Sequence, residues 1–93
     1  MILAAMTVEL YIHDSDSLKA RRRVVKSIKD RIRARFNVSI CEDSSDIRWK
    51  KATLGIAHIA NDKRSSDKEF SQITNAIEEN GHAEIMNREL EFL

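Results

Sequence analysis

The side chains best suited to chemistry in this chain are positively charged and lie close together. Between Ser17 and Arg35 the sequence carries a net charge of about +8, although the whole chain carries only +1. The basic residues of this segment are Lys19, Arg21, Arg22, Arg23, Lys26, Lys29, Arg31, Arg33 and Arg35. Clustered Lys and Arg side chains attract phosphate backbones and release their counterions. The segment therefore predicts a surface that binds RNA, ribosomal or other. The alternative is a solvated face whose charges are offset by acidic neighbours.

The same segment also has apolar residues at helical spacing, so it must present its charges from a helix. At about 100° per residue these apolar residues form one stripe, which consists of Leu18, Val25, Ile28 and Ile32 with Val24 on its flank. The opposite side of the predicted helix carries Lys19, Arg22, Arg23, Lys26 and Arg33. We expect these five side chains to be the phosphate contacts.

Arg21 is the exception on this helix, because its position falls inside the apolar stripe. One interpretation is that Arg21 binds an anion near the helix start, where free backbone N–H groups add positive potential. The other is that it pairs with a carboxylate, for which the sequence offers Asp14, Asp16 or Glu9. Both interpretations stay open, and Arg21 is kept among the candidate RNA-binding residues.

Trp49 is the only tryptophan of the chain and lies in a polar connector, residues 44–51, next to Arg48 and Lys50. An aromatic ring among basic residues can stack on a nucleic-acid base, because every base has a π-face. The alternative is that Trp49 covers an edge of the protein's own sheet, as large rings are usually buried.

Other chemistry is weakly indicated. The three histidines, His13, His58 and His82, are far apart in sequence, and the single cysteine, Cys41, is expected to be an unreactive, half-buried thiol. Asn61-Asp62 is expected to be a turn. The sequence has no phosphate-cradling glycine loop, nucleophile elbow or metal-ligand spacing. We therefore expect no metal, no cofactor and no catalytic residue.

The elements that must position these side chains follow from hydrophobic periodicity. Alternating and near-continuous apolar runs predict strands, the 3.6-residue stripes predict helices, and Ser66-Asp67-Lys68-Glu69 fits a capping box. The predicted order is strand, helix, strand, strand, helix, strand over residues 2–12, 17–35, 36–42, 52–61, 66–80 and 82–93. Two right-handed strand-helix-strand units predict an α+β, ferredoxin-like βαββαβ fold, a four-stranded antiparallel sheet with both helices on one face.

Composition agrees with one small globular domain over residues 1–93, because 42% of the residues are hydrophobic and 33% are charged. The apolar start, residues 1–8, has no preceding basic region and is interrupted by Glu9, so we predict neither a signal peptide nor a membrane span. One cysteine cannot form an internal disulfide, which favours a cytoplasmic location.

Two further functions compete with RNA binding. The predicted sheet has one uncovered face that carries Leu3 and Ala5, which could pair with a second copy or with another protein. The third hypothesis, an enzyme acting on a small anionic substrate, depends on Arg21 and the first loop alone. It is the weakest, and the chain is expected to be non-catalytic.

Two blocks of the sequence resemble a known family. They are Ser17 to Val25, continuing through Asp30-Arg31 to Arg35-Phe36-Asn37-Val38-Ser39, and Trp49 with Ala52-Thr53-Leu54-Gly55-Ile56 and Asn61-Asp62. The chain resembles the YlxP-like family, also named domain of unknown function 503, and departs from its usual pattern at Asp14 and at Ser44-Ser45. The resemblance implies a ferredoxin-like fold. Because family members are often encoded beside translation and ribosome-maturation genes, it also implies a role with RNA or the ribosome.

Overall fold

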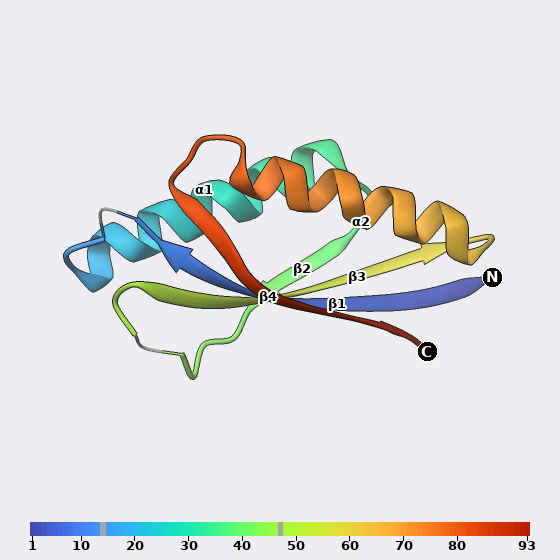
Figure 1. Ribbon diagram of the computed structural model, residues 1–93, viewed down its shortest axis with the longest axis horizontal. Helices are drawn as coiled ribbons and strands as arrows, with labels where there is room; N and C mark the ends of the chain where they lie inside the picture. Colours follow the sequence, from blue (N-terminus) through green and yellow to red (C-terminus); the bar gives the residue numbers. More distant parts are fainter. Residues whose placement is uncertain (14, 47) are drawn as a thin grey trace.

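The computed structural model describes residues 1–13, 15–46 and 48–93, and it has the predicted order of elements. The strands and helices are β1 (Ile2–Ile12), α1 (Leu18–Arg35), β2 (Ser39–Glu42), β3 (Lys51–Ala60), α2 (Lys63–Glu78) and β4 (Ala83–Phe92). The strands form one sheet in the order β2-β3-β1-β4, and each neighbouring pair is antiparallel. Both helices lie on the same side of this sheet (Figure 1). The ferredoxin-like prediction is therefore confirmed.

The core lies between the helices and one face of the sheet. Alternation along β1 sends Ala4, Met6, Val8, Leu10 and Ile12 to the helix side, where all five are buried. The stripe predicted for α1 is also buried at Val25, Ile28 and Ile32. From α2 the core receives Phe70, Ile73, Ala76 and Ile77. Because α1 uses one stripe for this packing, its opposite side is left for other contacts.

Two boundaries differ by three residues from the sequence prediction, and the others by at most two. Helix α2 begins at Lys63 and not at Ser66, because the Asp62 side chain is the N-cap and accepts a hydrogen bond from the Ser65 N–H at 2.7 Å. Ser66, expected to be the cap, is instead buried, and its hydroxyl lies 3.2 Å from His58 Nδ1. Strand β2 is also shorter than predicted and begins at Ser39.

The other face of the sheet carries no helix (Figure 1). Register places Leu3 opposite Ile59 at one end of this face and Tyr11 opposite Lys51 at the other. On β4 the same face carries acidic residues, because Glu84, Glu89 and Glu91 lie opposite Tyr11, Thr7 and Ala5. The uncovered face is therefore apolar at one end and negative along the β4 edge. In the described part of the chain, neither helix is apolar enough over a sufficient length to cross a membrane.

Candidate nucleic-acid interface

The start of α1 fixes the position of the basic face. Ser17 is the N-cap, and its hydroxyl accepts a hydrogen bond from the Ala20 N–H at 3.1 Å. With the apolar stripe docked on the sheet, the five predicted phosphate contacts all lie at exposed positions, namely Lys19, Arg22, Arg23, Lys26 and Arg33. The helix therefore presents these cations to solvent along its outer side.

Three of these cations have no partner among the described residues. Within the described residues, no carboxylate lies within ion-pair distance of Lys19, Arg22 or Arg23, and none of the three donates a side-chain hydrogen bond. All three come from the first two turns of α1. This N-terminal half of the helix is the part of the basic segment whose charge is least compensated.

Lys26 and Arg33 share one acidic neighbour on the same helix. Lys26 Nζ lies 2.6 Å from Asp30 Oδ2, and Arg33 Nη1 lies 3.8 Å from Asp30 Oδ1. The hydrogen bond from Lys26 is the main cause that lowers the pKa of the Asp30 carboxyl below its usual 3.8. Lys26 stays 75% exposed, and an exposed i,i+4 pair of this kind is weak. Its ammonium remains accessible to a second anion.

The other basic residues of α1 are used within the protein. Arg31 Nη2 donates to the Ala76 carbonyl at 2.9 Å, and Arg35 Nη1 lies 2.6 Å from Glu79 Oε2. Arg33 Nη2 also donates to the Ile40 carbonyl at 3.0 Å. The predicted charge offset by acidic neighbours therefore applies to cations such as Arg35 and not to the exposed cations at the helix start.

Arg21 pairs with a carboxylate, as one of its two interpretations expected, but the carboxylate is that of Glu42. Its side chain is 4% exposed, and its Nη1 lies 2.9 Å from Glu42 Oε2, at the end of β2. It also donates from Nε to the Lys51 carbonyl at 2.7 Å and from Nη2 to the Asp46 carbonyl at 3.0 Å. The predicted partners Asp16 and Glu9 are wrong, and Asp14 lies outside the described residues. Because its donors are occupied and buried, Arg21 is no longer a candidate phosphate contact. It instead holds the connector between β2 and β3 against α1, and we call these bonds the Arg21 clamp.

Trp49 lies in the connector that Arg21 holds. Trp49 is 58% exposed. The expectation that its ring is buried over an edge of the sheet is therefore wrong. The Ser15 hydroxyl donates to the Trp49 carbonyl at 2.7 Å and lies 3.2 Å from the Ser17 carbonyl at the cap of α1. These bonds keep the backbone of Trp49 beside the first turn of the basic helix. Figure 1 shows the connector and the start of α1 at the same end of the molecule.

Asp46 and Arg48 fix the connector further, and sequence reasoning did not identify this pair. The Arg48 guanidinium donates from Nε to Asp46 Oδ1 at 2.9 Å and from Nη2 to Asp46 Oδ2 at 2.8 Å. Chiefly through these hydrogen bonds, the pKa of Asp46 falls from 3.8 to about 2. The signal in the sequence was the Asp-x-Arg spacing in a polar connector, where a short side chain commonly bonds to a residue two positions later.

The remaining candidate groups are the histidines and Cys41. His13 and His82 meet through their backbones, with the His13 N–H 2.9 Å from the His82 carbonyl, while the His13 ring contacts Tyr11 edge-on. Cys41 is exposed and not half-buried as expected, because it lies on the uncovered face of the short edge strand β2. Across the described residues, no three His, Cys, Asp or Glu side chains are grouped to hold a metal ion.

Comparison with known proteins identifies the family. The sequence matches the family described as "Protein of unknown function (DUF503)" over residues 3–90. The chain belongs to the DUF503 family. A DUF503 relative, "Uncharacterized protein YlxP" of Bacillus subtilis (strain 168), is 35% identical over 65 residues, which are 70% of this chain and 71% of the relative. The predicted family resemblance is therefore confirmed.

One of the solved structures similar to this DUF503 chain supports the fold. A de novo designed protein with a ferredoxin fold, LFR1 1, matches with a TM-score of 0.58 at 17% identity, covering 98% of this chain and 86% of the design. A second designed protein, Foldit4, matches with a TM-score of 0.47 at 14% identity, covering 99% of this chain and 94% of the design. At these identities the first match supports the ferredoxin-like fold and nothing more.

Proposed function

We propose that this DUF503 protein is a non-catalytic RNA-binding factor that contacts single-stranded or looped RNA, ribosomal RNA foremost, through the start of α1 and the connector beside it. The observation that carries the proposal is a set of exposed cations at the start of α1, close to the backbone of an exposed Trp49. These cations, which have no ion-pair partner among the described residues, are Lys19, Arg22 and Arg23. In this arrangement the cations contact phosphates, Lys26 extends the contact along the helix, and the indole stacks on a base.

The electrostatics favour one face of the protein for this contact. Outside residues 17–35 the chain carries a net charge of about −7, and part of that charge lies on the uncovered sheet face, at Glu9 and along β4. A polyanion is therefore attracted to α1 and repelled from the sheet. Sheet-face binding, as in domains that stack bases on strands, needs two or three aromatic residues there. Of the described strand residues on this face, Tyr11 is the only aromatic one.

Single-stranded RNA suits the site better than a duplex because of Trp49. A base can stack on the indole only when it is not already stacked within a helix, and such stacking contributes about 1–3 kcal/mol per base. Hydrogen bonds of Arg21, Ser15 and Asp46 also hold the connector at several points. Binding therefore loses little conformational entropy in ordering this segment.

The test uses two double variants that remove the same charges from different helices. Lys19→Ala with Arg22→Ala removes two exposed cations from α1, and Arg64→Ala with Lys68→Ala removes two exposed cations from α2. Affinity for single-stranded segments of ribosomal RNA is measured by filter binding over a salt series. For single strands the logarithm of the affinity falls with a slope of about −0.7 per phosphate contact, so the α1 variant loses about 1.4 from the slope. The α2 variant keeps the wild-type slope.

Trp49 provides a separate readout, because it is the only tryptophan. RNA binding is expected to quench its fluorescence. Trp49→Ala is expected to weaken binding by about fivefold to a hundredfold while the salt slope stays unchanged, and Trp49→Phe retains most of the affinity. Binding that is absent or insensitive to salt, or an equal loss in the α1 and α2 variants, would refute the proposal.

Self-association is the second candidate function, and one observation favours it. At one end of the uncovered sheet face, Leu3 and Ile59 lie directly opposite each other, and Ile59 is 56% exposed. Leu93, also exposed, joins them through a hydrogen bond from its N–H to the Leu3 carbonyl at 2.8 Å. An apolar group of this kind on an otherwise charged face is suited to pairing with a second copy. Sedimentation velocity over a concentration series tests this directly.

A further inference from the structure

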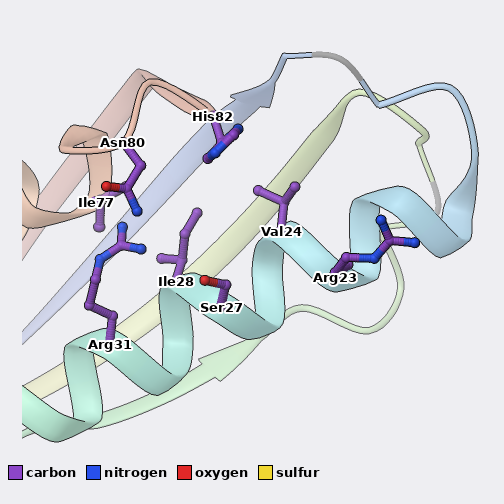
Figure 2. Close-up of a pocket in the computed structure, with 8 residues that line it drawn as sticks. All are labelled: Arg23, Val24, Ser27, Ile28, Arg31, Ile77, Asn80 and His82. Atoms are coloured by element: carbon purple, nitrogen blue, oxygen red, sulfur yellow. The ribbon is translucent and has the colours of Figure 1, made fainter.

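A groove lies between α1 and the end of α2, on the other side of α1 from β2. It has a volume of about 270 Å³ and is lined by Arg23, Val24, Ser27, Ile28, Arg31, Ile77, Asn80 and His82. Figure 2 shows that α1 supplies five of these residues, while Ile77, Asn80 and His82 approach from α2 and the segment after it. Among the proposed RNA contacts, Arg23 lies at one end of the groove (Figure 2), while Lys19, Arg22 and Lys26 do not line it.

The walls of the groove divide into an apolar base and a polar rim. Val24, Ile28 and Ile77 belong to the core or pack against it, so they give the groove a hydrocarbon surface. The polar lining residues are two arginines, a histidine, an asparagine and a serine, and the described lining contains no carboxylate. A hydrocarbon base with hydrogen-bond donors on its rim is the usual design of a small-molecule site.

Arg31 is the rim cation that is partly buried, whereas Arg23 is exposed. Its Nη2 donates to the Ala76 carbonyl at 2.9 Å, but its Nε is buried and has no hydrogen-bond partner. In the described chain no carboxylate lies within ion-pair distance of its guanidinium. The nearby acidic residues of α2 are engaged elsewhere, since Glu79 pairs with Arg35 and Glu78 accepts a hydrogen bond from the Ile85 N–H. A partly buried cation without a counter-charge favours an anion beside it.

We propose that this groove binds a small anion with an apolar body, whose ring or short chain lies against Ile28 and Ile77 and whose carboxylate or phosphate meets the Arg31 guanidinium. The volume limits the size of the ligand, because an apolar cavity of about 150 Å³ already holds benzene. The groove therefore takes one ring with one anionic group. Charge complementarity selects the anion, and the planar guanidinium suits either a carboxylate or a phosphate.

The experiment is an NMR titration of the whole chain with three probes that share a benzene ring, namely benzoate, phenyl phosphate and benzyl alcohol. Ligands this small bind with dissociation constants of about 1 mM, which such titrations measure. Saturable shifts of the Ile28 and Ile77 methyl signals and of the Arg31 Nε–H signal are expected with at least one anionic probe. Comparing benzoate with phenyl phosphate distinguishes a carboxylate ligand from a phosphate ligand.

Two variants locate the binding without dismantling the fold. Ser27→Leu fills the groove from an exposed helix position and is expected to abolish the shifts, while Ser71→Leu, an exposed serine of α2 outside the groove, leaves them unchanged. Arg31→Lys keeps the charge but loses the planar fork, and is expected to weaken binding about tenfold.

Several outcomes would overturn the proposal. One is that neither benzoate nor phenyl phosphate causes saturable shifts. The others are that benzyl alcohol binds as tightly as the anions, or that binding survives Ser27→Leu. The Lys19→Ala, Arg22→Ala variant retains the groove, so failure here and failure of the RNA proposal are separate results.

Discussion

Replacing Arg21 with methionine is expected to destabilise the fold by about 2–4 kcal/mol. Methionine retains the apolar stem of the side chain but removes the ion pair with Glu42 and the hydrogen bonds to the Asp46 and Lys51 carbonyls. Removing one partner of a buried ion pair costs about 3–5 kcal/mol. The lower end of our range reflects the 20% exposure of the Glu42 side chain, which lets water replace part of the lost contact.

Urea unfolding followed by circular dichroism measures this change. With a denaturant dependence of about 1–3 kcal/mol per molar urea, the midpoint falls by roughly 1–2 M. The control is Arg22→Met at the next, exposed position, where the free energy of unfolding changes by less than about 0.5 kcal/mol. A loss below about 1 kcal/mol at Arg21, or equal losses at both positions, would show that the clamp does not hold the connector.

Three further predictions concern the connector, the sheet face and the helix start. Asp46 has a folded-state pKa of about 2 against 3.8, so its ionised form stabilises the fold above about pH 4, and this contribution disappears as the pH falls towards 2. Because Arg48 is half-exposed, we expect Asp46→Asn to lower the free energy of unfolding by about 1 kcal/mol at pH 7 and by much less at pH 2. Urea titrations at the two pH values measure this loss, and an equal loss at both would contradict the prediction. Ile59→Lys is expected to abolish any dimer seen by sedimentation velocity without lowering the thermal midpoint, and a dimer that persists would exclude this end of the sheet as the interface. Lys19→Glu is expected to raise the free energy of unfolding by about 0.3–1 kcal/mol and to weaken RNA binding, and a variant that loses stability would contradict the helix-dipole argument below.

Periodicity predicted the fold well, because a buried face imposes the same spacing on the sequence and on the structure. The alternation of β1 and the apolar stripe of α1 are both found in the core. The start of α2 was missed because two segments could cap it. Asp62 caps the helix in place of the predicted capping box at Ser66, because the Ser66 hydroxyl is buried beside His58.

The candidate site was less predictable, since charge composition does not tell which cations find partners. The periodicity did place Arg21 in the apolar stripe, but its partners, Glu42 and two carbonyls, are 21 to 30 residues away and depend on how the sheet pairs. The same holds for the groove between the helices, whose lining comes from residues 23–31 and 77–82. Contacts between distant segments are set by the tertiary fold and leave no local spacing to find.

Fold stability accounts for Arg21 and for the cations in the second half of α1, but not for Lys19 and Arg22. Positive charge is favourable near the C-terminal end of a helix and unfavourable near the N-terminal end, where the backbone N–H groups already create positive potential. Arg33 and Arg35 lie in the last turn and both have internal partners. Lys19 and Arg22 lie at the other end, the first turn holds no acidic residue, and neither has a partner among the described residues. Their cost to the helix is offset once a polyanion is bound, which is the physical reason to seek the function of this chain at the start of α1.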